Sequence, residues 1–380
     1  MQFHKSESLT FGLELELQIV DPSNGRLSPS SMEILALLSE SPQSNRFAPE
    51  ATLATIELNS SIHRNASEME IEIRRLTQAV RAAANRIGRD VRGGGTQVTQ
   101  FWNERIIAPT QRARELEEKF GFLPKRFSTY GMHVHVGMPD ADIAVRIANV
   151  LQSFCPLFIA LSAASPFLQL EDTGFAAARP LEPLVYPHGG PMPLLRDWGH
   201  FEEVMEDLYA TQIASNVKDV YWDVRPKPEF GTIEVRVFDT PLSVRKAVVL
   251  AALTRGIAEL ALTGAVNVRF DSTTFEMNER VSRFNACRHA MEAQLFNPGT
   301  GQWVPARAWL QQLLETIADR NSAVMDSAYI AEIQTITQQE QDHVVMRNAW
   351  RAAQTVNGSD GDIAPALVAY SRPMCERLLS

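Results

Sequence analysis

The chain has 380 residues, of which 36 are Lys or Arg and 45 are Asp or Glu, so that its formal net charge is −9. With 45% hydrophobic and 21% charged residues it has the composition of a folded globular protein, which excludes wholesale disorder and collagen-like repeats. The acidic balance argues against a protein that binds nucleic acid or a membrane surface, because phosphate backbones and acidic lipids require a basic face.

Four short segments alternate between apolar and polar residues, which is typical of strands whose sheet is packed on one face and solvated on the other. They are Phe11–Val20, Leu53–Ser60, Met132–Gly137 and Thr232–Asp239. Long stretches with helical patterning separate them. The sequence therefore predicts an α+β fold in which distant segments assemble one antiparallel sheet.

An S-x-x-E capping box, from Ser67 to Glu70, predicts the start of a helix that runs to about Val91. Ser243 is the expected cap of a second helix over 244–263. The last 75 or so residues have helical patterning, with a loop expected at 358–361. Residues 179–197 are rich in Pro and Gly and have no period, which favours a lid, a binding loop or disorder.

The three cysteines are far apart and have no CxxC spacing, so neither a disulfide framework nor a zinc knuckle is expected. The first twenty residues lack the basic and apolar regions of a secretion signal. The most apolar stretch, 143–164, contains polar residues and a proline, which favours a pair of buried helices over a membrane span. We therefore expect a cytoplasmic protein.

The polar faces of the predicted strands carry glutamates, at Glu14, Glu16, Glu57 and Glu234. Residues two apart on a strand lie roughly 7 Å apart on the same side. At that distance two carboxylates repel by about 2 kcal/mol when the effective dielectric constant is near 20. Such a cluster normally raises its pKa values or holds cations. Any one of these glutamates alone is more often a surface residue, but their joint occurrence favours a shared site.

If the four strands share a sheet, these carboxylates converge with His133, His135 and Arg236. A site dominated by carboxylates suits Mg²⁺ or Mn²⁺, and Mg²⁺ also takes phosphate oxygens of a substrate. The pair His133-x-His135 also fits a metal-dependent hydrolase with a zinc ion held mainly by histidines. The chain has only eight histidines, mostly outside the alternating strands, which disfavours the hydrolase.

Two other motifs are less specific. Gly93–Thr96 is consistent with a helix C-cap and turn, and it lacks the lysine and spacing of a Walker phosphate loop. Arg225, in the stretch Trp222–Pro226, is a candidate anion clamp, although an isolated arginine is more often structural.

At these residues the sequence resembles the carboxylate–amine ligases of the glutamate–cysteine ligase type 2 (YbdK-like) family. The matching stretches occur in family order over about 10–288. They are GLELELQIVD (12–21), Glu50 with Glu57, GGGT (93–96), GMHVHVG (131–137), ALSAASPF (160–167), DTGFAAARP (172–180), GGPMP (189–193), KDVYWDVRP (218–226) and FGTIEVRVFDTPL (230–242).

The resemblance implies a glutamine-synthetase-like fold, in which an antiparallel sheet forms a half-open barrel with flanking helices. It implies one catalytic domain over 1–380, with its core at about 10–288 and a helical C-terminal portion at about 305–380. The implied reaction is ATP-dependent amide formation, in which an acid such as glutamate is phosphorylated and then attacked by an amine such as cysteine. Family members are often homodimers, so a second copy is an expected partner, but no nucleic acid or membrane is.

The resemblance also implies roles for individual residues. The implied ligands of Mg²⁺ or Mn²⁺ are Glu14, Glu16, Glu57, His133 and Glu234, with Glu50 nearby. Arg236 is expected to face the transferring phosphoryl group, and Arg225 the nucleotide or the acid. The implied substrate and nucleotide contacts are Asn59, His135, Thr96 and Trp222. Glu50 lies seven residues before Glu57, which puts it on the opposite strand face unless a bulge or turn intervenes.

The chain departs from the family pattern at two places. Gln97 stands where many relatives have a histidine, and Arg112-Ala113 stands where they have Arg-Tyr. These departures leave the predicted metal face intact and leave the acid and the amine open. They also leave room for a third interpretation, a non-catalytic protein that binds a nucleotide or an amino acid.

Overall fold

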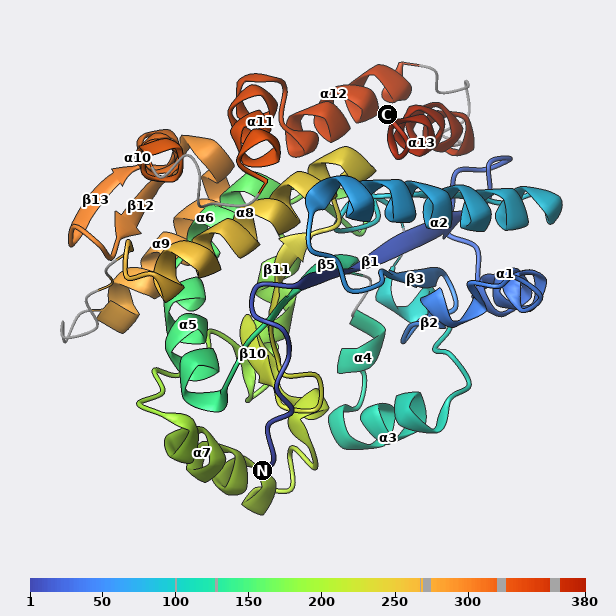
Figure 1. The fold of residues 1–380 in the computed structure, drawn as a ribbon. Helices are drawn as coiled ribbons and strands as arrows, with labels where there is room; N and C mark the ends of the chain where they lie inside the picture. Colours follow the sequence, from blue (N-terminus) through green and yellow to red (C-terminus); the bar gives the residue numbers. More distant parts are fainter. Residues whose placement is uncertain (100, 127–128, 267, 269–274, 320–325, 356–362) are drawn as a thin grey trace.

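A seven-stranded antiparallel sheet forms the centre of the computed structural model (Figure 1). The structure describes residues 1–380 apart from 100, 127–128, 267, 269–274, 320–325 and 356–362. The strands are β1 (Phe11–Val20), β2 (Phe47–Pro49), β3 (Thr55–Asn59), β4 (Asp90–Arg92), β5 (Gly131–Gly137), β10 (Val224–Lys227) and β11 (Thr232–Asp239). Their order is β10–β11–β5–β1–β3–β2, with β4 also paired to β1. The four predicted strands are therefore confirmed, as is their assembly into one antiparallel sheet.

The alternation read from the sequence decides which face of β1 is buried. Leu13, Leu15 and Leu17 are at most 1% exposed, and burying each of them contributes about 2 kcal/mol. Because the side-chain period of a strand is two, Glu14 and Glu16 must then lie on the opposite face. A slip of one residue in the pairing would bury both carboxylates in the core, so the apolar pattern fixes the register.

The strand register brings the polar side chains together. Glu14 pairs with Asn59 of β3 on one side and with His133 of β5 on the other, and Glu16 pairs with Glu57. On the far side of β5, Glu234 of β11 lies between two strands and pairs with His135 and with Arg225 of β10. Segments more than 200 residues apart in the sequence are thus neighbours on one face.

A β-bulge in β11 departs from strict alternation. Val235 pairs with Val134 and Phe238 pairs with Met132, so that β11 carries one extra residue between the two pairs. The extra residue puts Phe238 in the core, where its ring lies 5.0 Å from that of Phe158. It also lets Val237 line the cavity described below. Bulges are common next to active sites, where they redirect side chains.

Helices cover the apolar face of the sheet (Figure 1). Those that pack on it are α2 (Ala66–Arg86), α5 (Ala141–Ser153), α6 (Cys155–Ser162) and α8 (Val244–Leu262). The others are α1 (Ser31–Leu38), α3 (Gln111–Phe120), α4 (Leu123–Arg126), α7 (Trp198–Ala210), α9 (Phe275–His289), α10 (Ala306–Asp319), α11 (Ser327–Gln338), α12 (Asp342–Gln354) and α13 (Ala364–Arg377). The expected α+β arrangement of sheet and flanking helices is confirmed.

The predicted capping box is wrong. The cap of α2 is Asn65, whose side chain accepts a hydrogen bond from the amide of Glu68 at 2.9 Å, and Ser67 lies inside the first turn. The helix also ends earlier than predicted, because Gly88 has φ +69° and stops it, and residues 90–92 pair with β1 as β4. By contrast, Ser243 caps α8 as predicted, and accepts from the amide of Lys246.

The apolar stretch 143–164 forms the buried pair α5 and α6, as expected. In the described chain no single helix is long and apolar enough to cross a membrane. The two helices together meet that criterion only as a pair bent by 54°.

The C-terminal part is helical as predicted, and the loop expected at 358–361 lies outside the described residues. Three two-stranded sheets complete the fold: β6 (Phe167–Leu168) with β7 (Glu171–Asp172), β8 (Gly189–Gly190) with β9 (Tyr221–Trp222), and β12 (Gln294–Asn297) with β13 (Gln302–Pro305). Helix α13 is tied to the sheet by Arg92, which is 2% exposed and donates to Gln18 and to Ser371.

Replacing the observed cap of α2 tests its assignment. Asn65→Ala removes the acceptor of the Glu68 amide, so we expect the free energy of unfolding to fall by about 1 kcal/mol in urea denaturation followed by circular dichroism. Ser67→Ala is the matched control, because it leaves that hydrogen bond in place. Equal losses in the two variants would contradict the assignment of the cap to Asn65.

Candidate active site

A cavity of about 450 Å³ opens on the polar side of the sheet. At one end its lining includes Glu16, Glu50, His133, Arg179 and Arg236. Other lining residues come from α3, α4, β9 and the 3₁₀ segment η3 (Arg179–Val185), and also from the turn between β2 and β3, from β11 and from α9. The cavity therefore lies between the charged face of the sheet and elements outside the sheet.

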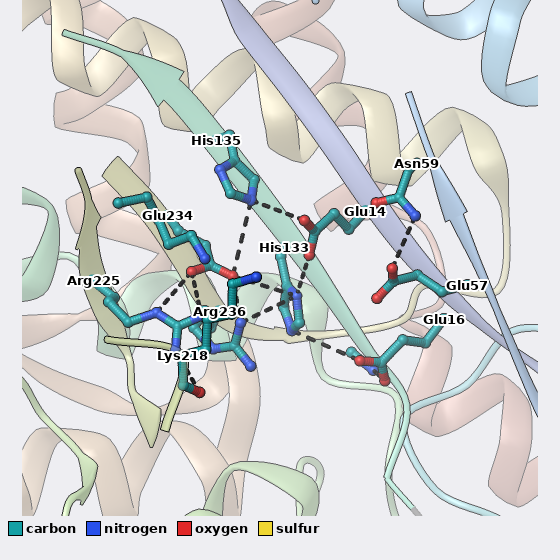
Figure 2. A network of polar contacts seen from close by, with 12 residues as sticks. Glu14, Glu16, Glu57, Asn59, His133, His135, Lys218, Arg225, Glu234 and Arg236 are labelled. Carbon is teal, nitrogen blue, oxygen red and sulfur yellow. Dashed lines mark hydrogen bonds and ion pairs between the residues drawn. The ribbon is translucent and has the colours of Figure 1, made fainter. Parts of the chain in front are cut away.

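One group of ligand-type side chains lies around β5. Oxygen and nitrogen atoms of Glu14, His135 and Glu234 all lie within 4.8 Å of one another. The Glu14 carboxylate hydrogen-bonds His133 Nδ1 at 2.8 Å and His135 Nε2 at 3.1 Å (Figure 2). The other ring nitrogen of His135 lies 3.0 Å from the Thr232 hydroxyl, which orients the imidazole.

A second group lies on the side of β1 toward β3. Carboxylate oxygens of Glu16, Glu50 and Glu57 also lie within 4.8 Å of one another. Glu50 joins them because β2 ends at Pro49 and a turn intervenes before β3 begins at Thr55. The alternation problem raised by its sequence position is thereby resolved: Glu50 and Glu57 are on neighbouring segments of a hairpin, not on one strand.

His133 lies between the two groups. Its Nδ1 is 3.8 Å from Glu234 and its Nε2 is 3.8 Å from Glu16 (Figure 2). Burial and the neighbouring Arg236 lower the pKa of His133 to about 4. The imidazole is therefore neutral near pH 7, the form in which a histidine can ligate a metal.

The two groups differ in how far nearby arginines neutralise their carboxylates. Burial alone would raise the pKa of Glu234, but Arg225 and Arg236 lower it well below its usual value. In the second group, burial and the nearby Glu50 raise the pKa of Glu16 to about 8, and burial and Glu50 raise the pKa of Glu57 well above its usual value. In the second group, formed by Glu16, Glu50 and Glu57, the nearby arginines therefore do not fully neutralise the carboxylates.

The donor set of both groups fits a hard divalent cation. Glutamate oxygens outnumber imidazole nitrogens, and neither group among the described residues contains more than one histidine. Carboxylate-rich sets of this kind suit Mg²⁺ or Mn²⁺, whereas zinc sites built on histidines need two or three imidazoles. A cation would also offset the burial and the repulsion by Glu50 that raise the pKa of Glu16.

Arg225 and Arg236 differ in what they can contact. Arg225 donates twice to Glu234, at 2.9 and 2.7 Å, and also to the backbone carbonyls of three residues in 217–220. It is 3% exposed and does not line the cavity, so it holds Glu234 in place. Arg236 bonds Glu234 and approaches His133 Nδ1 at 3.4 Å, and its guanidinium lines the cavity.

The remaining residues expected to bind substrate are spread more widely. Asn59 donates to Glu57 at 2.9 Å beside the second group, and Trp222 lines the cavity. Thr96 is 2% exposed and its hydroxyl donates to the carbonyl of Phe167, away from the cavity. The Gly93–Thr96 turn is not a helix C-cap but follows β4, and a side chain at Gly95 would overlap that of Asp239.

Arg179 is a cavity residue to which the sequence analysis gave no role. The residue is 8% exposed, and its Nε has no hydrogen-bond partner among the residues that the structure describes. Its other nitrogens reach only the backbone carbonyls of Arg236 and Val237, at 3.3 to 3.4 Å. Gly131 makes room for it, because a side chain there would overlap the guanidinium. Arg179 lies in the stretch DTGFAAARP (172–180), one of those that carry the family resemblance, and this was the signal that could have identified it.

The Pro- and Gly-rich segment 179–197 is more ordered than its sequence indicates. It contains η3 and β8, and α5 binds its far end: Asn149 exchanges two hydrogen bonds with the backbone of Leu195, and Gln152 accepts one from Met192. Arg283 donates to the carbonyl of Pro180 at the near end. The segment forms one wall of the cavity, and its closure over a substrate stays a prediction.

Comparison with known proteins settles the family. The family model for glutamate–cysteine ligase family 2 matches residues 10–360. The chain belongs to this family. A relative from Paracidovorax citrulli, provisionally named glutamate–cysteine ligase 2, is 38% identical over 321 residues, which are 83% of this chain and 84% of the relative. A relative of the same provisional name from Bordetella avium is 41% identical over 78% of this chain and 73% of its own length.

Solved structures confirm the fold of this family member. The glutamate–cysteine ligase of Francisella tularensis, determined in complex with AMP, matches with a TM-score of 0.67 at 12% identity, over 99% of this chain and 90% of that one. A bifunctional glutathione synthetase from Pasteurella multocida matches with a TM-score of 0.63 at 14% identity, over 96% of this chain and 52% of that one. The predicted glutamine-synthetase-like fold is confirmed, with a sheet that stays open.

The raised pKa of Glu16 predicts a pH dependence of metal binding. Below about pH 8 a cation must displace the proton, so its affinity falls by about tenfold per pH unit. We expect Mn²⁺ to raise Tm more at pH 8 than at pH 6, measured by differential scanning fluorimetry. In the metal-free protein, stability falls as pH rises from about 5 to 8, because the folded state holds the proton more tightly than the unfolded chain.

Glu16→Gln is the control for this pH dependence. It removes the titrating group, so the metal-free stability should vary less between pH 5 and 8. A rise in Tm with Mn²⁺ that is the same at both pH values in the parent protein would contradict the prediction.

Proposed function

We propose that this member of glutamate–cysteine ligase family 2 is an ATP-dependent carboxylate–amine ligase that forms an amide through an acyl phosphate, with glutamate as a candidate acid and cysteine as a candidate amine. The observation that carries the proposal is that His133 lies between two groups of carboxylates and lines one cavity together with Glu16, Glu50 and the guanidinium groups of Arg179 and Arg236. Such a site has acidic ligands for cations and basic groups for anions within one space.

The reaction has two steps. A carboxylate oxygen of the acid attacks the γ-phosphorus of ATP, the bond to the bridging oxygen breaks, and ADP leaves. The amine nitrogen then attacks the carbonyl carbon of the acyl phosphate, the carbon–oxygen bond breaks, inorganic phosphate leaves with the electron pair, and the nitrogen loses a proton. The first step is needed because a carboxylate has no good leaving group.

Phosphoryl transfer requires mainly positioning and neutralisation of charge. Arg236 presents its guanidinium to the cavity and is oriented by Glu234, which Arg225 holds from behind. Glu14, His135 and Glu234 would hold a cation on one side, and Glu16, Glu50 and Glu57 on the other, with His133 between the two groups. A bound Mg²⁺ or Mn²⁺ supplies charge neutralisation at phosphate oxygens.

Arg179 is suited to bind the carboxylate of the acid. Arg179 is buried, its Nε has no partner among the described residues, and its hydrogen bonds to backbone carbonyls are long. A hydrogen bond from its guanidinium to an anionic ligand would therefore be stronger than its present bonds to the carbonyls. Segment 179–197 would then exclude water from the acyl phosphate until the amine arrives.

The alternatives fit the geometry less well. In the hydrolase, His133 and His135 would share one zinc ion, but each imidazole is engaged by carboxylates and neither group contains both. The non-catalytic alternative rested on the departures at Gln97 and Ala113, but the buried Gln97 carboxamide accepts hydrogen bonds from Thr99 and does not line the cavity.

One assay separates the three. The protein is incubated with ATP, Mg²⁺ and glutamate or other acids, together with a panel of amines, and ADP is followed with a coupled enzyme system. ADP release that needs both acid and amine supports the ligase. Cleavage of a substrate without ATP would support the hydrolase, and saturable nucleotide binding without turnover would support the binding protein.

Arg236→Lys tests the phosphoryl contact. Lysine keeps the charge but loses the planar pair of donors, so we expect kcat to fall by about 100-fold while the protein remains folded. Retention of the native near-ultraviolet circular dichroism spectrum is the control for folding. An unchanged kcat would remove Arg236 from the reacting centre.

Arg179→Gln tests the proposed carboxylate contact. We expect KM for the acid to rise by about 10- to 100-fold, with KM for ATP changed much less, because a charge-assisted hydrogen bond to the acid contributes about 1.5–3 kcal/mol. Steady-state ADP release at varied acid and varied ATP measures both constants. A rise confined to KM for ATP would assign Arg179 to the nucleotide instead.

A further inference from the structure

Part of the cavity lining, outside the central sheet, is apolar. Six residues that line the cavity make up this apolar wall: Ala113, Leu116, Pro124, Pro180, Pro183 and Tyr186. The first two lie on α3, the third on α4, and the last three on η3 or directly after it. Ala113, Pro124, Pro180 and Tyr186 are buried, so the wall is part of the packed structure and not a loose surface.

The apolar wall offers few hydrogen bonds. The side chains of alanine, leucine and proline have no donor or acceptor, and each of its three prolines also lacks a backbone N–H. A purine base needs donors and acceptors along its edge for recognition, and this wall supplies hardly any. The anionic acid is likewise better matched to Arg179 and Arg236 at the other end. The proposed ligase has three substrates: ATP, the acid and the amine. Of these, the amine is the one that can be wholly apolar apart from its amino group.

Ala113 enlarges the space in front of the wall. It is in the first turn of α3, lines the cavity and is 4% exposed. Its amide donates to the capping hydroxyl of Thr110, which fixes the direction of the residue. Because its side chain is a single methyl group, Ala113 takes up little of the cavity next to the prolines and Tyr186.

Most charged side chains beside the apolar wall are paired, Arg112 with Asp219 and Asp223 with Arg283. Lys218, which also lines the cavity, is exposed to solvent. A substrate group that entered here would gain mainly from removal of apolar surface from water and from ring contacts with Tyr186.

We propose that the acceptor amine of this chain carries an aromatic or branched aliphatic group, which the apolar wall holds while the amino group faces the acyl phosphate. This inference rests on the proposed ligase function and names its substrate class. The chemistry is that of the second step above: the carbon–nitrogen bond forms, the carbon–oxygen bond to phosphate breaks, and the ammonium protons are released.

The experiment compares amines that differ only in the group that would meet the wall. With saturating ATP and Mg²⁺, and with the acid that gives the fastest ADP release, kcat/KM is measured for 2-phenylethylamine, ethylamine and cysteine, and each amide is identified by mass spectrometry. We expect 2-phenylethylamine to exceed both ethylamine and cysteine by about 10-fold or more.

Ala113→Tyr fills the space and supplies the decisive comparison. We expect it to lower kcat/KM for 2-phenylethylamine by about 10-fold or more, with little change for ethylamine and in KM for ATP. Arg114→Tyr is the matched control, because it adds the same ring at an exposed position of the same helix, and it should leave all three values unchanged. Ala113→Leu, which is smaller and apolar, should lie between the parent and Ala113→Tyr.

The outcomes are distinguishable. Turnover of ethylamine or cysteine at least as fast as that of 2-phenylethylamine would overturn this inference and leave the ligase intact. A rise in KM for ATP in Ala113→Tyr would overturn it too, because the wall would then hold the base. Absence of amine-dependent ADP release with every amine would overturn the proposed ligase function, and this inference with it.

Discussion

Crowding of carboxylates on one face of the sheet is the constraint that shapes this site. At 4.8 Å and an effective dielectric constant near 20, two ionised carboxylates repel by about 3 kcal/mol. The chain meets this cost differently in its two groups. Glu234 is neutralised by Arg225 and Arg236, whereas Glu16, Glu50 and Glu57 have raised pKa values. The second group therefore gains most from an added cation.

The rest of the fold keeps this costly arrangement from relaxing. The leucines of β1 and the helices behind them fix the register, so that Glu14 and Glu16 cannot turn into the core. The bulge in β11 leaves Glu234 and Arg236 on the charged face while Phe238 returns to the core. Gly131 makes room for Arg179 across the sheet. Repulsion at the site is thus offset by apolar burial elsewhere in the fold.

The cavity combines two kinds of surface. Its lining includes the charged side chains Glu16, Glu50, Arg179 and Arg236 of the proposed phosphoryl site, and it also includes the apolar wall. The elements that build the wall, α3, α4 and η3, lie outside the central sheet. In such an architecture residues of the wall can change without altering the charged face of the sheet.

The sequence by itself determined the strands, the face on which Glu14, Glu16, Glu57, His133 and Glu234 lie, and the family, because alternation is a local property and the motifs are specific. Only the tertiary structure decided three other matters. A hairpin turn brings Glu50 close to Glu57, and Arg225 donates its hydrogen bonds to Glu234 instead of lining the cavity. Arg179, in contrast, does line the cavity. Each of these depends on contacts between segments distant in the chain or on a departure from regular geometry. A period of two along one strand carries no information about which remote guanidinium will be buried beside it.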